Sequence, residues 1–532
     1  MKTKDNSSEA KKAGSQKAAS NIVLCFFASF GVFFFIPMDL FLANAGDIAF
    51  PLKPLAIFMG IVTLAVFAVL FLVCMLTKGK ANNILRAIVL GTSTAFYIQG
   101  NFLAVNMGLL NGSEYDLPIW KAALNIAIWL VIMAIPFFIL VKFPNVFDSA
   151  VSYIPAAILL IQIFTLCISP FLNMSKYGTG NIVEIFYGDT RWINTTASLD
   201  TYSENKNLII ILADEYCSFA FDDAIADDPD AVSEFDGFTY YTNTVGKFGL
   251  TYPSLGYIFT ADKDASYSDL TFLETVSKNY KANFYCDTVV PPAQVFSKYS
   301  DNIILKKITL GETRGYASSI YRISFFRCMP EILKPLFWSS GDIGQELISK
   351  TAKKLDLTNG VSEYSYNNID FYVSMPSELK STDENVFKFL YIHGLHDPRT
   401  ATRDLERAPE NERVSTTDEA VAVNKIVNKY LKILKNNGVY DNSEIIFMAD
   451  HGHYRDKKYL LLMYKPAAQT ESGIKISNAP ISYDDIFPTL VMLAGGEPNA
   501  RTIFDIGENE ERVRYYGENN EEITGNIKQD PQ

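Results

Sequence analysis

Five long apolar segments constrain the fold of this 532-residue chain more than any other feature. A helix needs about 20 mostly apolar residues to cross the hydrocarbon core of a bilayer, and each segment reaches that length. The segments are residues 21–42, 55–76, 83–103, 120–141 and 151–172. The third contains Thr92, Ser93, Thr94 and Gln99, so we expect it to face other helices rather than lipid. The N-terminal third is predicted to be a five-helix transmembrane bundle.

Lysine and arginine in the short loops predict the orientation of this bundle, because cytoplasmic loops carry an excess of both. They gather in the N-terminal tail and after the second segment, as Lys2, Lys4, Lys11, Lys12, Lys17, Lys78, Lys80 and Arg86. The intervening loops carry Asp47, Glu114 and Asp116 and fewer positive charges. Five spans that start inside end outside. We therefore expect a multi-pass protein of the cell membrane with a cytoplasmic N-terminus and everything after residue 173 extracytoplasmic.

The composition turns globular after residue 173, and it sets the expected domain limits. We expect a cytoplasmic tail (1–20), the transmembrane domain (21–172), a juxtamembrane linker (173–205), a globular domain (206–500) and a C-terminal tail (501–532). The net charge of −12 argues against nucleic acid as a partner, because phosphate binding needs clustered Lys and Arg. Six cysteines in a chain this long are too few for a disulfide scaffold. A bond between Cys286 and Cys328 stays open.

From residue 207 the pattern changes to short apolar runs separated by helical stretches, which favours an α/β fold. The clearest strands are Asn207–Ala213, Val386–Ile392 and Ser443–Met448. Each is apolar along almost its whole length, as a strand buried on both faces requires. Apolar residues at helical spacing over 418–437 predict a covering helix before the third strand.

Each of these strands is followed by residues that can do chemistry. Asp214 and Glu215 follow the first strand, His393 and His396 the second, and Asp450, His451 and His453 the third. His393, His396, His451 and His453 are all four histidines of the chain. Ligands bind beyond the carboxyl ends of the strands in open α/β sheets, so we expect the three ends to converge on one site. Imidazole and carboxylate suit Zn or Mn, and Asp450 beside His451 is a plausible ligand pair.

Five motifs resemble the sulfatase-like branch of the alkaline phosphatase superfamily in order and spacing. They are NLIIILADE, TYPSLGYIFTA, HGLHDP, IIFMADHG and SYDDIFPTLVMLAG, between residues 205 and 500. The five-span layout resembles the lipoteichoic acid synthases, and GLHDP is similar to a segment of the phosphoethanolamine transferases. The resemblance implies a mostly parallel central sheet with helices on both faces in the domain of residues 206–500, which would be catalytic.

The resemblance also implies a metal-bound nucleophile. Thr251 falls where sulfatases carry the residue converted to formylglycine and where phospholipid-dependent transferases carry a nucleophilic Thr. A threonine cannot become formylglycine, and Leu255 replaces the usual Arg, so sulfate-ester hydrolysis is disfavoured. Asp214, Thr251, Asp450 and His451 would hold a divalent metal ion, Mn or Zn, with Mg also open. From the residues alone, Thr251 could instead cap a helix starting near Pro253.

The remaining candidates have less specific roles. His396 matches the phosphate-contacting histidine of relatives and is assigned to substrate binding. His393 and His453, with Glu215 as a neighbour of Asp214, could touch a second metal ion or support the ligands. Asp485 is expected to cap a late helix with Pro488 in its first turns. Cys217 is read as a packing thiol.

Taken together, these features imply a membrane-bound, metal-dependent phosphotransferase. It would move glycerol phosphate or phosphoethanolamine from a membrane phospholipid to a cell-envelope glycan or glycolipid through a phospho-threonine. A phosphodiesterase or other hydrolase would use the same residues. A third alternative is a non-catalytic lipid-binding regulatory protein, favoured by His453 and Asp397 where relatives carry other residues. The donor head group, acceptor and oligomeric state are not encoded in any feature described above.

Overall fold

The computed structural model describes residues 17–45, 50–103, 118–173, 186–264, 267, 269–286, 293–337, 361–409, 413–455, 457–469, 471–517 and 519–524. The chain forms two compact units. The first contains Met1–Arg191 and Lys307–Leu347, and the second Trp192–Lys306 and Ile348–Gln532. Residues 307–347, which lie inside the expected catalytic domain of 206–500, thus group with the N-terminal helices. Most of the expected cytoplasmic tail, and the loop residues Asp47, Glu114 and Asp116, lie outside the described residues.

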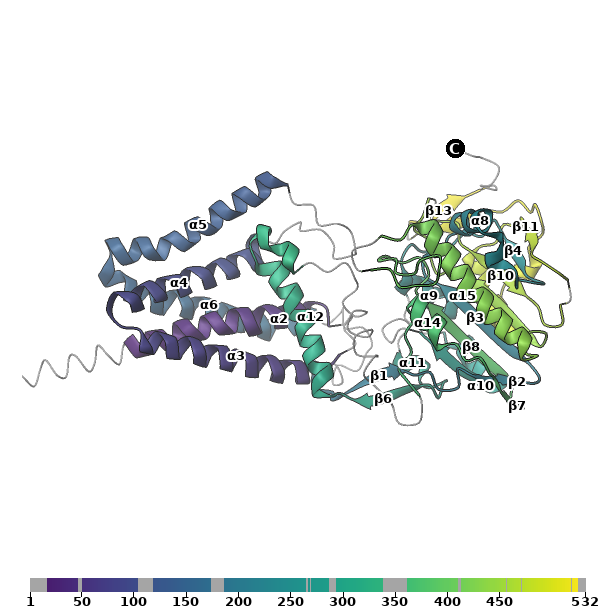
Figure 1. The fold of residues 1–532 in the computed structure, drawn as a ribbon, viewed down its shortest axis with the longest axis horizontal. Helices are drawn as coiled ribbons and strands as arrows, with labels where there is room; N and C mark the ends of the chain where they lie inside the picture. Colours follow the sequence, from purple (N-terminus) through teal and green to yellow (C-terminus); the bar gives the residue numbers. More distant parts are fainter. Residues whose placement is uncertain are drawn as a thin grey trace, which may run out of the picture. The chain divides into compact units, whose positions relative to one another are not determined.

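The first unit is helical (Figure 1). Its elements are a helix from Lys17 that runs through the π-helical turn η1 (Gly31–Phe35) into α2 (Ile36–Ala43), then α3 (Leu52–Leu76), α4 (Gly79–Ile98), η2 (Gln99–Leu103), α5 (Ile119–Lys142), α6 (Pro144–Leu172), α12 (Leu310–Cys328) and η5 (Glu331–Leu336). Four helices are long and apolar enough to cross a membrane: Lys17–Ala43, α3, α5 and α6. The third expected span folds as α4 and η2 but does not meet that criterion among the described residues.

Polar residues of α4 point into the first unit, as its sequence predicts. Arg86 is fully buried, and its guanidinium donates to Asp148 of α6 at 2.6 Å and to Ser20 at 2.8 Å. Gln99, which follows α4, is also fully buried and accepts from Asn125 of α5 at 2.8 Å. Buried polar groups need such partners, so these bonds fix the order of the helices around α4.

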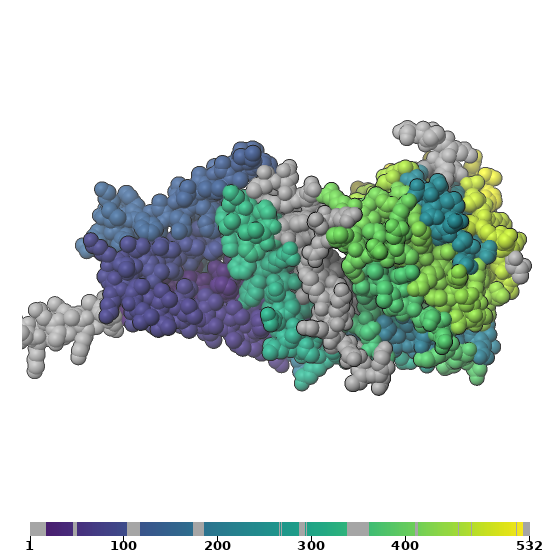
Figure 2. Space-filling model, viewed as in Figure 1, coloured from purple at the N-terminus to yellow at the C-terminus, as the bar shows by residue number. Residues whose placement is uncertain are grey.

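Helix α12 lies across α2 and α3 of the first unit (Figures 1 and 2). A capping box of Thr309 and Glu312 starts it. Near its other end, Arg327 pairs with Asp39 of α2 at 2.9 Å and donates to the carbonyl of Gly100 at 2.8 Å. These charge-assisted bonds explain why a segment so far along the chain belongs to the first unit.

A seven-stranded sheet forms the core of the second unit (Figure 1). Its order is β11-β4-β10-β9-β3-β8-β5, in which only β10 runs antiparallel to its neighbours β4 and β9. The strands are β3 (Asn207–Ala213), β4 (Thr239–Tyr241), β5 (Lys281–Tyr285), β8 (Val386–Ile392), β9 (Ser443–Met448), β10 (Leu462–Lys465) and β11 (Lys475–Ser477). The three strands predicted from sequence are confirmed as β3, β8 and β9, and they are adjacent and parallel.

Helices cover both faces of this sheet, as expected. They are α8 (Ser218–Asp227), α9 (Thr251–Thr260), α10 (Thr271–Asn279), α11 (Ala293–Phe296), α14 (Asn368–Ser374), α15 (Thr416–Asn436) and α16 (Ile486–Leu493). On one face, Phe389 of β8 packs against Phe259 of α9. On the other, Lys388 lies over the ring of Tyr202, whose hydroxyl bonds Tyr430 of α15. The predicted helix at 418–437 is confirmed as α15.

Short elements occupy the expected linker and C-terminal tail. Two-stranded sheets join β1 (Thr190–Asn194) to β6 (Ile303–Lys307), β2 (Thr201–Ser203) to β7 (Lys380–Thr382), and β12 (Arg514–Tyr516) to β13 (Glu521–Ile523). Single 3-10 turns are η4 (Pro229–Val232), η6 (Tyr483–Asp485) and η7 (Ile503–Asp505). The β12–β13 hairpin shows that part of the segment after residue 500 is folded.

Candidate metal and nucleophile site

Two strand ends bring three metal-ligating side chains together. Asp214 follows β3, and Asp450 and His451 follow its parallel neighbour β9. One potential ligand atom from each of the three lies within 4.8 Å of the others, and this is the one such group found among the described residues. His451 Nε2 is 3.4 Å from Asp214 Oδ1 and 3.7 Å from Asp450 Oδ2. Parallel pairing of two buried strands thus creates the cluster.

Burial makes this cluster electrostatically unfavourable without a cation. Asp214 is 3 % exposed, Asp450 fully buried and His451 4 % exposed. Burial and the nearby Asp450 charge raise the pKa of Asp214 well above its usual range. Burial lowers the pKa of His451, but the carboxylates of Asp450 and Asp214 outweigh it and raise that pKa. A positive charge between these groups would therefore be strongly attracted.

The hydrogen bonds of the cluster leave coordinating atoms available. Asp450 Oδ1 accepts from the backbone N–H groups of Glu215 at 3.2 Å and His451 at 2.8 Å. By contrast, Asp214 Oδ1 and Asp450 Oδ2 are buried with no hydrogen-bond partner among the described residues. Two unsatisfied carboxylate oxygens beside an imidazole nitrogen fit a divalent cation with mixed oxygen and nitrogen ligands. We conclude that these residues suit a metal ion.

Thr251 brings a hydroxyl to the same place. It is the first residue of α9, and its Oγ1 lies 3.1 Å from His451 Nε2. The N-cap of α9 is Leu250, and no side chain caps this helix end. The alternative role of Thr251 as a cap is therefore not what the structure shows, and its hydroxyl faces the cluster instead. The free N–H groups of a helix N-terminus also attract phosphate.

Tyr391 is a site residue that the sequence reasoning missed. Its hydroxyl donates to Asp214 Oδ2 at 2.5 Å, and both side chains are buried. Tyr391 lies on β8, where it pairs with Leu212 of β3 in the parallel register, two residues before Asp214. The sequence contained a signal for this role, because a tyrosine in a buried strand, two residues before His393, needs a partner for its hydroxyl. Tyr391 holds one Asp214 oxygen and leaves the other facing the cluster.

The two histidines after β8 have different surroundings. His393 is 2 % exposed, and burial, with the charges of His396 and Arg407, lowers its pKa to about 3. Its ring centroid is 5.6 Å from those of Tyr366 and His396. His396 is half-buried, and its Nδ1 donates to the carbonyl of Asp397 at 2.6 Å. Neither histidine belongs to the three-residue cluster, and His396 is the more exposed of the two.

The other candidates do not belong to the three-residue cluster. Glu215 has a φ of 57° and a half-buried side chain, although its charge contributes to the raised pKa values of Asp214 and His451. His453 is exposed. Cys217 is a buried free thiol whose Sγ donates to the carbonyl of Tyr454, which agrees with its packing role. Cys328 is a free thiol as well, so it is not joined to Cys286 by a disulfide.

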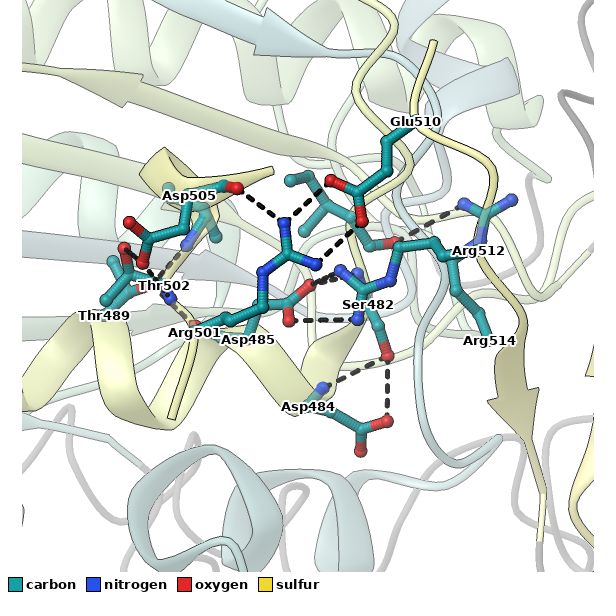
Figure 3. A network of polar contacts seen from close by, with 12 residues as sticks. Ser482, Asp484, Asp485, Thr489, Arg501, Thr502, Asp505, Glu510, Arg512 and Arg514 are labelled. Atoms are coloured by element: carbon teal, nitrogen blue, oxygen red, sulfur yellow. Dashed lines mark hydrogen bonds and ion pairs between the residues drawn. The ribbon is translucent and has the colours of Figure 1, made fainter. Parts of the chain in front are cut away.

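Asp485 has the structural role expected from its sequence context. It completes a capping box with Ser482 and is the N-cap of α16, which has Pro488 in its first turn. Arg512 donates to both of its carboxylate oxygens, at 2.8 and 3.2 Å (Figure 3). A second cluster beside it joins Arg501 to Glu510 (Figure 3). Asp485 is thus fully engaged in the fold.

Comparison with known proteins finds similarity only among solved structures; no protein-family model and no curated protein matches the chain. A Vibrio parahaemolyticus protein of the alkaline phosphatase superfamily aligns with 62% of this chain and 76% of its own, at 12% identity and a TM-score of 0.36. Lipoteichoic acid synthase LtaP from Listeria monocytogenes aligns with 59% and 78%, at 13% identity and 0.33. Phosphonate monoester hydrolase SpPMH from Silicibacter pomeroyi aligns with 56% and 75%, at 15% identity and 0.31. The first of these neighbours is described as a member of the superfamily that the motifs resemble.

Proposed function

We propose that this protein is a membrane-anchored, metal-dependent phosphotransferase of the alkaline phosphatase superfamily. Its donor is a membrane phospholipid, and the transferred group is glycerol phosphate or phosphoethanolamine. Its acceptor is a cell-envelope glycan or glycolipid. The N-terminal helices form five spans in this proposal, with α4 enclosed by the others, the N-terminus in the cytoplasm and the second unit outside.

The observation that carries the proposal is the bond between Thr251 Oγ1 and His451 Nε2 at the buried cluster of Asp214, Asp450 and His451. A threonine hydroxyl is a weak nucleophile unless a neighbouring group or a cation activates it. A divalent cation held by these four residues would lower the pKa of the hydroxyl and stabilise charge on phosphoryl oxygens. Among the described residues, the hydroxyls of Thr251 and Tyr391 bond to this cluster, Thr251 to His451 and Tyr391 to Asp214.

Thr251 performs the bond-forming step. Its Oγ1 attacks the phosphorus of the lipid phosphodiester, a new Oγ1–P bond forms, and the bond to the diacylglycerol oxygen breaks. The proton lost by the threonine is balanced by the one taken up by diacylglycerol. An acceptor hydroxyl then attacks the phospho-threonine, which restores Thr251 and passes on the head group. His396, a half-buried histidine after β8, would contact the phosphate, as the motif that contains it implies.

The apolar helices give this chemistry a physical advantage. A lipid donor is confined to the membrane, and the helices Lys17–Ala43, α3, α5 and α6 are long and apolar enough to hold the chain there. An enzyme tethered to the same surface meets the donor at high effective concentration. A hydrolase would use the same residues with water as acceptor, and only the product distinguishes the two.

Release of diacylglycerol tests the proposal. The full chain in detergent, with Mn or Zn, is incubated with labelled phosphatidylglycerol or phosphatidylethanolamine. We expect diacylglycerol from the parent and none from Thr251→Ala, while Thr251→Ser, which keeps a hydroxyl, retains part of the activity. Thr271→Ala is the matched control, because Thr271 is an exposed first residue of another helix, α10. Release that persists in Thr251→Ala would refute the assigned nucleophile, and release of free head-group phosphate without an acceptor would indicate a hydrolase.

A further inference from the structure

The segment that leads into Thr251 is held on both sides by backbone hydrogen bonds. Val245 is fully buried and forms β-bridges with Tyr459 and with Ser482. The N–H of Val245 donates to the carbonyl of Ile481 at 2.9 Å, and the N–H of Gly246 donates to that of Lys458 at 2.9 Å. Residues 243–249, which we name the approach segment, therefore have a fixed path before the chain reaches the site.

The C-terminal hairpin, residues 513–524, adds a second set of contacts to the approach segment. Arg514 of β12 is 1 % exposed, and its Nη1 donates to the carbonyl of Asn243 at 2.6 Å and to its side-chain oxygen at 2.9 Å. The N–H of Gly517 donates to the carbonyl of Lys247 at 2.8 Å. The hairpin thus binds the approach segment at two points, its first residue Asn243 and its fifth residue Lys247.

Apolar side chains of the approach segment and the C-terminal hairpin also pack together. Val245, Tyr459, Tyr516 and Ile523 form a small buried cluster of their own, separate from the core around the sheet. The approach segment also comes very close to the hairpin at Gly249, where an added Cβ would lie 2.8 Å from the hydroxyl oxygen of Tyr516. A side chain at this position would collide, so the close approach depends on glycine.

The three metal-ligating residues do not depend on the hairpin in this way. Asp214 and Asp450 continue directly from the central strands β3 and β9, whose backbone bonds hold them. Thr251, by contrast, is preceded by nine residues outside the sheet after β4 ends at Tyr241. The distance between Thr251 and His451 therefore depends on the contacts that hold the approach segment. The hairpin supplies those contacts from the most C-terminal part of the second unit.

We propose that the C-terminal hairpin is a positioning element that fixes Thr251 against His451 through Arg514, Gly517 and Tyr516. Arg514 and Tyr516 are positioning residues, because they touch the approach segment and not the reacting atoms. The inference deepens the proposed function and rests on it for the role of Thr251. It predicts that loss of the hairpin contacts impairs Thr251 and spares Asp214, Asp450 and His451.

Hydrogen exchange tests the contacts without reference to activity. In Arg514→Ala, we expect exchange of the backbone amides of residues 243–252 to rise about tenfold or more, because local opening exposes them, while β3 and β9 stay protected. Arg514→Lys, which keeps the charge and one donor, should lie between Arg514→Ala and the parent. The matched control is Arg501→Ala, which removes a half-exposed arginine from the same C-terminal segment and should leave these amides unchanged. Unchanged exchange in Arg514→Ala would overturn the proposal.

Kinetics then separate positioning from general damage. A displacement of about 1 Å costs on the order of 100-fold in rate, so Arg514→Ala should lower kcat by about that factor with a smaller change in KM. Its affinity for Mn, measured by calorimetry, should fall no further than that of Thr251→Ala, because Asp214, Asp450 and His451 are held by the sheet. A larger loss of metal affinity would mean a merely structural role and would overturn the proposal.

A compensating pair of substitutions covers the case in which Arg514→Ala does not fold. Gly249→Ala introduces the collision with Tyr516 and should lower kcat, whereas Tyr516→Phe removes the hydroxyl that it meets. The double variant should recover most of the lost rate, and failure to recover would contradict a direct contact between the hairpin and the approach segment. If the parent itself shows no phosphotransfer, the proposed function fails, and the exchange experiment still decides whether the hairpin holds the segment.

Discussion

Two buried carboxylate clusters of the second unit differ in how their charge is compensated. Asp485 receives two bonds from Arg512 and one from the backbone N–H of Ser482, so each of its oxygens has a partner. Asp214 and Asp450 lie close together, and each has one buried oxygen with no partner among the described residues. Burying a charge without a partner costs several kcal/mol. The difference indicates that the first cluster serves the fold, and the second is built for a cation from solution.

Glu419 shows a third way to bury a carboxylate. It is fully buried on α15, and its Oε1 accepts from Asn368 and from the backbone N–H groups of Thr400 and Ala401. Burial outweighs these bonds and raises its pKa to about 8. Glu419 is therefore compensated by a proton at neutral pH. The buried charge at three carboxylate sites of the second unit is thus compensated in three ways. An arginine compensates Asp485, a proton compensates Glu419 and, in our proposal, a metal ion compensates Asp214 and Asp450.

The largest expected effect is on metal-dependent stability. A ligand at 1,000 times its Kd stabilises the state that binds it by about 4 kcal/mol, and we expect Mn or Zn to raise the free energy of unfolding of the parent on that scale. Asp450→Asn should abolish this gain. Without metal the variant should be at least as stable as the parent, because the substitution removes one of two neighbouring buried charges. Thermal unfolding with and without chelator measures both, and a variant still stabilised by metal would contradict the cluster as the binding site.

The next largest effect is the pH dependence contributed by Glu419. Its folded pKa of about 8 lies above its usual value of 4.5, so folding binds a proton between these limits. The contribution of Glu419 to stability is then full below about pH 4.5 and is lost as pH rises toward 8, by about 5 kcal/mol in all. Glu419→Gln, which replaces the proton with an amide donor, should remove this loss. Denaturant unfolding at pH 6 and 8.5 gives the comparison, and equal pH slopes in the two proteins would show that Glu419 is ionised.

Breaking the arginine-compensated cluster should destabilise the fold without touching metal binding. Asp485→Asn loses the charged partner of Arg512 and should cost about 2 kcal/mol, part of which is offset because burial already raises the pKa of Asp485. Urea unfolding measures the loss. Calorimetry with Mn provides the control, and its affinity should match the parent. A change of metal affinity would mean that the two clusters are not independent.

The smallest effect is expected at Tyr391. Its hydroxyl orients Asp214, and partners that orient ligands typically contribute 10-fold to 100-fold in metal affinity. We expect Tyr391→Phe to weaken Mn binding about tenfold with little effect on folding. Tyr202→Phe is the matched control, since its hydroxyl bonds Tyr430 at 2.7 Å and faces no metal ligand. Equal affinity in Tyr391→Phe and the parent would assign the bond a packing role.

Sequence patterns predicted the strands of the sheet correctly where strong local rules apply. β3, β8 and β9 begin and end where their apolar runs do, because a strand buried on both faces tolerates few polar residues. Asp214, Asp450 and His451 meet because adjacent parallel strands end at one edge of the sheet. The loop residues were less predictable: His393 turns inward and His453 outward, and no periodicity in a short loop decides between the two.

Other features depend on contacts between distant parts of the chain. Helix α12 joins the first unit through Arg327 and Asp39, a pair separated by 288 positions in the sequence. The C-terminal hairpin has three-residue strands that are rich in charge and lack a strand pattern. Its role follows from Arg514 and Asn243, whose proximity no local rule predicts. The third expected span does not meet the apolar criterion among the described residues, and the buried side chains of Arg86 and Gln99 bond other helices of the first unit.

The measurement that tests the account most directly is mass spectrometry of the peptide that contains Thr251. The full chain is incubated with phosphatidylglycerol or phosphatidylethanolamine and Mn, quenched before an acceptor is added, and digested. We predict a head-group phosphate adduct on Thr251 that disappears when a glycolipid acceptor is supplied, and that does not form in Asp450→Asn. Diacylglycerol release with no adduct on Thr251, or an adduct on another residue, would contradict the claim that this threonine and the buried cluster form one reactive site.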